Sequence, residues 1–144
     1  MRACWAGLAV ALALGGCARE RQQAAALVRG DEPVIAGTLE GGPWGGEDIN
    51  GGGIMDYARV DMTFADGAVS GLAGCNRYSG AFRQSGAAVT VGALATTRKL
   101  CAPALMETER KFLGALEAAT KLRFDATGAA FLVAEDGRIL KARR

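Results

Sequence analysis

The residues of this chain that could do chemistry are four cysteines and a modest number of carboxylates, and histidine is absent. Without histidine the chain lacks Ser-His-Asp and Cys-His nucleophiles, histidine zinc sites and an imidazole pH switch. Glu107 and Glu109 are two acids in one predicted helix, but side chains two residues apart point away from each other, which does not suit shared acid and base catalysis. The sequence therefore predicts a protein that is not an enzyme and has no catalytic residue.

The first sixteen residues have the pattern of a bacterial lipoprotein signal peptide. One early charge, Arg2, precedes an apolar stretch over residues 3–14 that is shorter than the ~20 residues of a membrane-spanning helix. The following Leu-Gly-Gly-Cys, ending at Cys17, resembles a lipobox. We favour this interpretation over an ordinary secretory signal because charged start, apolar stretch and box follow in the correct order. Residues 1–16 are therefore the predicted signal peptide.

Cys17 is the predicted site of lipidation. The resemblance to a lipobox implies a diacylglycerol thioether and an N-acyl chain, and two or more acyl chains anchor a protein stably without a spanning helix. The next residue is Ala18 rather than Asp, which is similar to lipoproteins sorted to the outer membrane. We expect a location in the cell envelope, at the outer membrane and facing the periplasm.

A polar, alanine-rich stretch without a strong apolar period follows, so residues 17–33 are predicted to be a tether. Residues 34–144 are then long enough for a single domain with a modest core. The net charge of the chain is +2. Such a balance argues against nucleic acid as a partner, because nucleic-acid binding requires a basic stripe.

The cysteine count predicts one disulfide in this domain. Cys4 leaves with the signal peptide and Cys17 is acylated, so Cys75 and Cys101 remain, and an even remainder in an exported domain implies a bridge. Closing a loop of about 25 residues stabilises a fold by ~3.5 kcal/mol in the chain-entropy model. A redox pair or a thiolate metal site is disfavoured, because there is no Cys-x-x-Cys unit and two thiolates do not complete a zinc site.

A glycine-rich segment, residues 41–53, is the remaining candidate for ligand binding. It lacks the Gly-Lys-Ser/Thr of a phosphate-binding loop and the glycine spacing of a dinucleotide loop. Four residues in or near it could offer oxygen atoms to calcium, but they do not have the spacing of an EF-hand loop: Glu47, Asp48, Asn50 and Asp56. We expect no cofactor and no metal here, and we predict a short strand at residues 34–39 and an early strand at residues 44–50.

The central part of the chain predicts consecutive antiparallel hairpins. Residues 58–64 alternate between apolar and polar side chains, Asp66-Gly67 is a hairpin turn, and residues 68–75 return. Small residues on one face of this returning strand, Gly71 among them, allow another backbone to approach closely. Further strands are predicted around residues 78–83 and 88–91, followed by an extended connection over residues 94–100.

The last third predicts one helix and three strands. Residues 103–120 form an amphipathic pattern whose apolar stripe consists of Leu105, Phe112, Leu116 and Ala119. Strands follow around residues 122–124, 131–133 and 139, and residues 141–144 are predicted to be a solvated basic tail. The predicted fold class is mainly β (α+β): a small antiparallel meander, barrel-like, with one packed amphipathic helix.

These blocks resemble the META domain family, which includes the bacterial heat-shock-inducible HslJ lipoproteins. The resemblance covers about residues 44–140 and rests on Val-Ser-Gly-Leu-Ala-Gly-Cys-Asn-Arg-Tyr-Ser-Gly at residues 69–80, on Leu-Ala-Thr-Thr-Arg-Lys-Leu-Cys at residues 94–101, and on Glu109 with the apolar residues behind it. It implies a compact antiparallel β fold with one packed helix and an envelope role tied to stress or antibiotic tolerance. It implies no established activity, cofactor or catalytic residue.

Two functions remain in competition. The first is a noncatalytic envelope module that contacts an unidentified envelope protein through an exposed surface around the motif residues Gly74, Asn76, Arg77, Tyr78 and Thr97. Taken singly, Asn76 is better explained by a hydrogen bond within its own turn and Tyr78 by a place in the core. The alternative is a small-ligand or metal carrier that uses the barrel interior, with Trp44 and Tyr78 as its lining.

Overall fold

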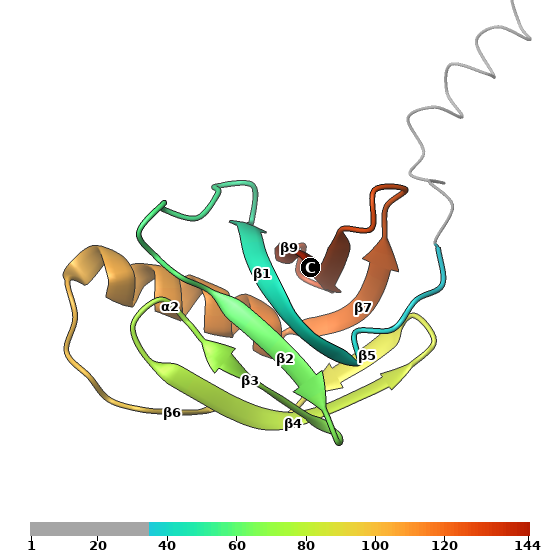
Figure 1. Ribbon diagram of the computed structural model, residues 1–144, viewed down its shortest axis with the longest axis horizontal. Coiled ribbons are helices and arrows are strands. Elements are labelled where there is room, and N and C mark those ends of the chain that lie inside the picture. The colour runs from blue at the N-terminus through green and yellow to red at the C-terminus, as the bar shows by residue number, and fades with distance from the viewer. Residues whose placement is uncertain (1–34) are drawn as a thin grey trace, which may run out of the picture. The chain divides into compact units, whose positions relative to one another are not determined.

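Antiparallel pairing closes eight strands into a ring in the computed structural model, which describes residues 35–144 (Figure 1). Around the ring the order is β3-β2-β1-β9-β8-β7-β5-β4, and pairing between β3 and β4 closes it, while β6 pairs with the first half of β4. The strands are β1 (Gly41–Ile49), β2 (Asp61–Ala65), β3 (Ala68–Leu72), β4 (Arg77–Ser85), β5 (Ala88–Val91), β6 (Ala95–Thr96), β7 (Ala119–Phe124), β8 (Ala130–Ala134) and β9 (Ile139–Arg143). The predicted mainly β, barrel-like meander is confirmed.

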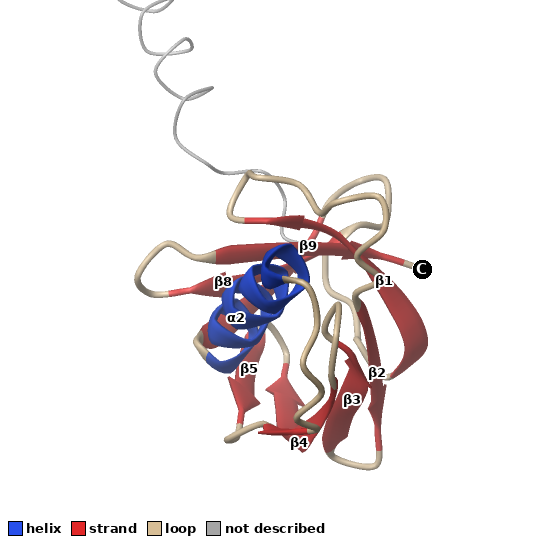
Figure 2. Cartoon of the chain, turned by 90° about the vertical axis from the view of Figure 1, so that its left-hand side faces the viewer, coloured by secondary structure: helices blue, strands red, loops and turns tan. Residues whose placement is uncertain are grey.

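One helix, α2 (Pro103–Glu117), interrupts the order of hairpins between β6 and β7. It lies against the barrel and contacts β9, β1, β5 and β8 (Figure 2). Its buried face differs from the predicted stripe, because Thr108 and Glu109 are buried beside Phe112 and Leu116, while Leu105 is only half-buried. The helix ends at Glu117, so Ala119 belongs to β7 and not to the helix as predicted.

Apolar and polar side chains alternate along β2 and the residues before it, and the apolar side chains point into the barrel as predicted. Val60, Met62 and Phe64 are all buried, and Asp66-Gly67 turns the chain with positive φ at both residues, so that Ala65 pairs with Ala68. The core that these strands enclose is tightly filled, and the rings of Phe64 and Phe82 lie 4.5 Å apart between centroids. The hairpin predictions for this region are confirmed.

The predicted strand at residues 34–39 is wrong for the part that the structure describes. Residues 35–40, here called the leading segment, make only isolated bridges, from Ile35 to Phe124 and from Glu40 to Phe64. The segment therefore crosses β7 and β2 instead of pairing along one strand. Leu39 is fully buried, and its carbonyl accepts the Trp44 indole N–H at 3.0 Å.

The prediction of a solvated basic tail at residues 141–144 is also wrong, because β9 continues through Arg143 and pairs with β1. This register places Lys141 and Arg143 on either side of Glu47, and each cation lies 2.9 Å from one of its carboxylate oxygens. The Arg144 guanidinium stacks over the Trp44 ring, 4.5 Å from its centroid. Pairing across the sheet therefore gives all three cations partners.

The signal peptide, Cys17 and the tether lie outside the described residues. Within residues 35–144, no helix has both the length and the apolar character needed to cross a membrane.

Replacing Gly71 by alanine tests the close approach between β3 and β2. A Cβ atom at Gly71 would overlap the Asp61 carbonyl, so we expect Gly71→Ala to lower the free energy of unfolding by about 1–3 kcal/mol. Gly45 in β1 is the matched control, because a Cβ there would meet only the Arg143 carbonyl oxygen at 3.7 Å. Urea unfolding of both variants measures the difference, and equal losses would contradict the proposed steric cause.

Replacing Glu47 tests the ion pairs that hold β9 to β1. The hydrogen bond from Lys141, with further help from Arg143, lowers the pKa of the Glu47 carboxyl below its ordinary 4.5. A carboxyl whose pKa is lowered by folding stabilises the protein above pH 4.5, and this contribution is lost as the pH falls through the folded value. Because the group is screened by solvent, we expect Glu47→Gln to cost only about 0.2–1 kcal/mol at pH 7 and nothing at low pH.

Thermal unfolding from pH 7 down to pH 3 measures this difference. Glu135→Gln, which removes an exposed carboxylate that makes no ion pair among the described residues, is the control and should change little at any pH. A Glu47 effect that persists unchanged at low pH would show that something other than charge is lost.

Candidate functional site

The motif residues meet at a buried polar centre around Asn76, whose exposed fraction is 1%. Its backbone N–H and its side-chain amide donate to the two carboxylate oxygens of Glu109, at 2.8 and 3.1 Å. Its amide oxygen accepts from the Thr97 hydroxyl at 2.8 Å and from the Lys99 backbone N–H at 2.7 Å. Asn76 thereby joins the start of β4, the helix α2 and the segment before Cys101.

A glycine turn directs Asn76 inwards. Gly74 follows β3 with φ +91°, a conformation that favours glycine, and a Cβ atom there would face the Leu105 carbonyl of α2 at 3.5 Å. The chain reverses at this point, with the Ala73 N–H bonded to the Asn76 carbonyl. The side chain is left free to bond to distant segments, so the interpretation that it satisfies only its own turn is wrong.

The segment over residues 97–101, here called the motif loop, is held at both ends. The Thr97 hydroxyl donates to Asn76 and accepts the Arg77 backbone N–H at 3.1 Å, and the Thr97 N–H donates to the Arg77 carbonyl. At the other end Cys101 is bridged to Cys75, with 6.1 Å between their Cα atoms. The predicted disulfide is confirmed, and it closes the loop onto the β3–β4 turn.

Glu109 is the residue of this centre whose role the sequence reasoning missed. The sequence predicts for Glu109 only a place in the helix, pointing away from Glu107, yet its exposed fraction is 8%, and no cation pairs with it among the described residues. The helical period contained the signal, because Leu105, Glu109, Phe112 and Leu116 fall on one i, i+4, i+7, i+11 stripe. An acid on an apolar stripe predicts a buried partner, which here is the Asn76 amide.

Tyr78 belongs to the core, as the interpretation preferred from the sequence predicted, and neither Tyr78 nor Asn76 contributes to an exposed contact surface. The exposed fraction of Tyr78 is 3%, its ring meets Phe112 edge-on at 5.4 Å, and its hydroxyl donates to the Asp61 carbonyl at 2.9 Å. Burial, with a smaller contribution from the charge of Asp61, raises the pKa of Tyr78. The phenol therefore remains a neutral structural donor.

The exposed part of the motif consists of Arg77 and the motif loop. Arg77, Arg98 and Lys99 are all exposed, and Leu100 between Lys99 and the disulfide is 96% exposed. A depression of about 200 Å³ lies beside them, lined by residues of the loop together with Asn76, Met106 and Glu109. The centre thus has a buried polar side and an exposed basic side with one apolar residue.

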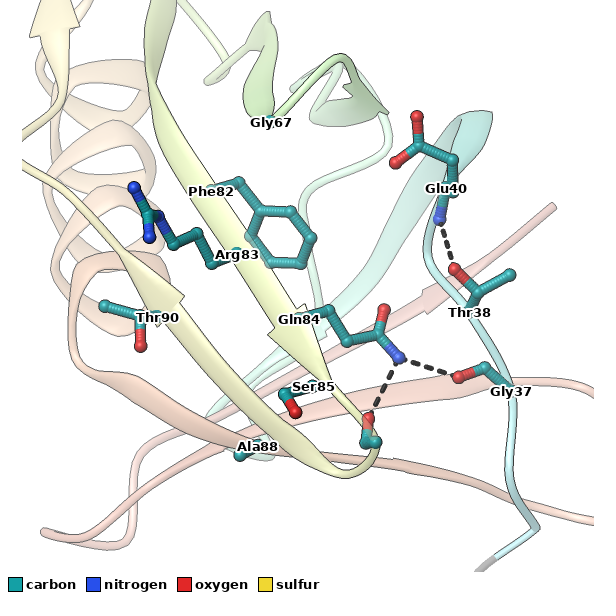
Figure 3. A pocket seen from close by; sticks show the side chains of 11 residues that line it. Gly37, Thr38, Glu40, Gly67, Phe82, Arg83, Gln84, Ser85, Ala88 and Thr90 are labelled. Carbon is teal, nitrogen blue, oxygen red and sulfur yellow. Dashed lines mark hydrogen bonds between the residues drawn. The ribbon is translucent and has the colours of Figure 1, made fainter.

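A larger hollow lies elsewhere, between the leading segment and the β4–β5 hairpin (Figure 3), with a volume of about 770 Å³. The Gln84 side chain spans it, donating to the carbonyls of Gly37 at 2.7 Å and Gly86 at 3.0 Å and accepting the Leu39 N–H. These bonds fasten the leading segment to β4 and involve both the amide nitrogen and the amide oxygen of Gln84. The hollow is an open surface feature without a convergent set of reactive groups.

The acidic side chains of the described residues do not form a metal-holding cluster. No three acidic, cysteine or histidine side chains gather within residues 35–144 to hold a metal ion. Glu107 pairs at the surface with Arg110 and Lys111, and the hydrogen bond from Arg110 lowers the pKa of Glu107, while Glu109 is turned inwards. The two acids do not converge, as the sequence predicted.

The barrel interior is occupied by buried apolar side chains, which does not favour the carrier alternative. Trp44 and Tyr78, the proposed lining of a ligand cavity, are instead members of the packed core. The remaining pockets of the described part of the chain lie at its surface, against loops and the helix.

Comparisons with known proteins agree with this geometry. The pattern of the META domain matches residues 37–144. Among solved structures, the chain is similar to the NMR structure of a protein from Burkholderia xenovorans, with 25% sequence identity and a TM-score of 0.61, over 74% of this chain and 83% of that chain. No curated protein matches the sequence.

Replacing Asn76 tests whether the buried centre holds the domain together. Asn76→Ala removes a donor to Glu109 and leaves a buried carboxylate short of hydrogen bonds, so we expect a loss of about 2–3 kcal/mol in the free energy of unfolding. The exposed neighbour Arg77 is the control, and Arg77→Ala should change stability by less than about 0.5 kcal/mol. Equal effects of the two substitutions in urea unfolding would contradict a structural role for the Asn76 amide.

Proposed function

Because the chain belongs to the META domain family over residues 37–144, we propose that it is a noncatalytic interaction module of the bacterial cell envelope. In this proposal Cys17 carries the lipid anchor, residues 17–33 are the tether and the barrel is the working part. The protein is HslJ-like in this sense and supports envelope stress tolerance. Its place is the outer membrane, facing the periplasm.

The observation that carries the proposal is the two-sided centre around Asn76. A buried network and a disulfide hold the backbone of the motif loop. The exposed side presents the side chains of Arg77, Arg98, Lys99 and Leu100, and the three cationic side chains have no hydrogen-bond or ion-pair partner among the described residues. An enzyme would be expected to use its most constrained polar groups in an accessible cleft. Here Asn76 and Glu109 bond to each other, and Asn76 fixes the motif loop, so these groups stabilise an exposed surface. This arrangement favours recognition of another molecule.

A further feature supports export. Disulfides persist in oxidising compartments and are rare in the cytosol, so the Cys75–Cys101 bridge agrees with the signal peptide expected from the sequence.

Photo-crosslinking in cells tests this function. A photoreactive amino acid in place of Arg77 should give discrete adducts with an envelope protein, while the same replacement of Lys111, on the exposed face of α2, should give none. The intact mass of the mature protein should also show loss of residues 1–16 and acylation of Cys17. Absence of adducts at both positions would remove the interaction function, and an unmodified Cys17 would remove the anchor.

A further inference from the structure

The cations of the domain divide into those with partners and those without. Six are ion-paired with carboxylates: Arg59, Arg110, Lys111, Arg138, Lys141 and Arg143. Arg123 and Arg144 stack on aromatic rings. Among the described residues, the cations without either partner are Arg77, Arg98 and Lys99 at the motif loop, and Arg83 and Lys121 elsewhere. Uncompensated positive charge is therefore concentrated at the motif loop.

The same loop exposes the domain's most accessible large apolar side chain. Leu100 is 96% exposed, compared with 68% for Tyr57 and 44% for Ile35. Leu100 cannot turn inwards easily, because Cys101 is fixed by the disulfide and Lys99 is fixed by Asn76 through both its backbone N–H and its carbonyl. An exposed leucine held in this way is typical of a contact residue.

Rigidity of the loop favours binding, because little conformational entropy is lost when a preorganised surface is covered. Arg77 is part of the same rigid unit, since its backbone exchanges hydrogen bonds with Thr97. The adjacent depression of about 200 Å³ is large enough for a side chain of a partner and is bordered by Arg98 and Lys99. Glu109 also lines the depression but is bonded to Asn76, so the exposed cations of the rim favour a partner that is negative where it meets them.

We propose that Arg77, Arg98, Lys99 and Leu100 form a docking surface for an acidic segment of a partner protein, with an apolar residue of that segment seated against Leu100. This inference rests on the proposed function and specifies the chemistry of its partner. A protein segment is favoured over a lipid surface, because the depression of about 200 Å³ beside these cations has the size of a single side chain.

Peptide binding tests this chemistry on the chain from residue 17 with Cys17→Ser, after its thermal unfolding has been matched to that of the mature protein. The probe is a short fluorescent peptide in which glutamate alternates with glycine around one central phenylalanine. Two analogues carry glutamine in place of glutamate, or alanine in place of phenylalanine. We expect the glutamate peptide to bind about tenfold more tightly than the glutamine analogue at low salt, with the difference shrinking as salt is added.

Variants assign the binding to the docking surface. Arg98→Glu combined with Lys99→Glu should abolish the preference for glutamate, and Leu100→Ser should abolish the preference for phenylalanine over alanine. The control, Arg83→Glu combined with Lys121→Glu, reverses the same number of exposed, unpartnered charges outside the surface and should leave both preferences unchanged.

Three results would overturn the inference: equal affinity for the glutamate and glutamine peptides, an equal effect of the control charge reversal, or Leu100-dependent binding only to phosphatidylglycerol vesicles. Crosslinked partners at position 77 together with no glutamate preference would retain the proposed function and reject the acidic partner. Glutamate preference without any crosslinked partner would retain the surface chemistry and reject the envelope interaction.

Discussion

The hydrogen bonds between Asn76 and Glu109 are the contact on which the arrangement of the domain depends. A carboxylate buried without a cation is costly unless donors satisfy it, and here one residue supplies both a backbone and a side-chain donor. The same amide fixes the backbone at Lys99, so three segments distant in sequence are held at a single point. Loss of these hydrogen bonds would leave the Glu109 carboxylate without its donors on the buried side of α2. It would also free the motif loop at Lys99.

Closure of the barrel depends on a second set of contacts, between β5 and β7. In the chain these two strands are separated by β6 and α2. The strands β5 and β7 share only one register pair, Ala88 with Lys121, supplemented by a bond from the Leu122 N–H to the Ala87 carbonyl. Neighbouring contacts reinforce this weak side: Glu117 at the end of α2 accepts the Leu94 N–H, and Gln84 fastens the leading segment nearby. The helix and the leading segment are therefore both bonded to the barrel near this side.

The location of the polar groups in the fold supports the functional interpretation. The interior is apolar, and the large hollow is spanned by a glutamine whose side chain makes three hydrogen bonds. The most constrained polar network lies directly behind an exposed basic loop. Such an arrangement stabilises a surface in one conformation, which suits recognition better than chemistry.

The sequence by itself determined the features that depend on local pattern: the alternating strand at residues 58–64, the hairpin turns, the helix and, by counting cysteines, the disulfide. Even the burial of Glu109 could be predicted from its place on the apolar helical stripe. Only the tertiary structure decided which distant groups would meet. Closure of the ring brought Glu47 to Lys141 and paired a predicted solvated tail with β1. The turn at Gly74 directed the Asn76 side chain to distant partners instead of its own turn. The physical reason is that periodicity records which face of an element is buried, whereas the partner of a polar side chain is set by strand register and chain reversal, which local sequence does not specify.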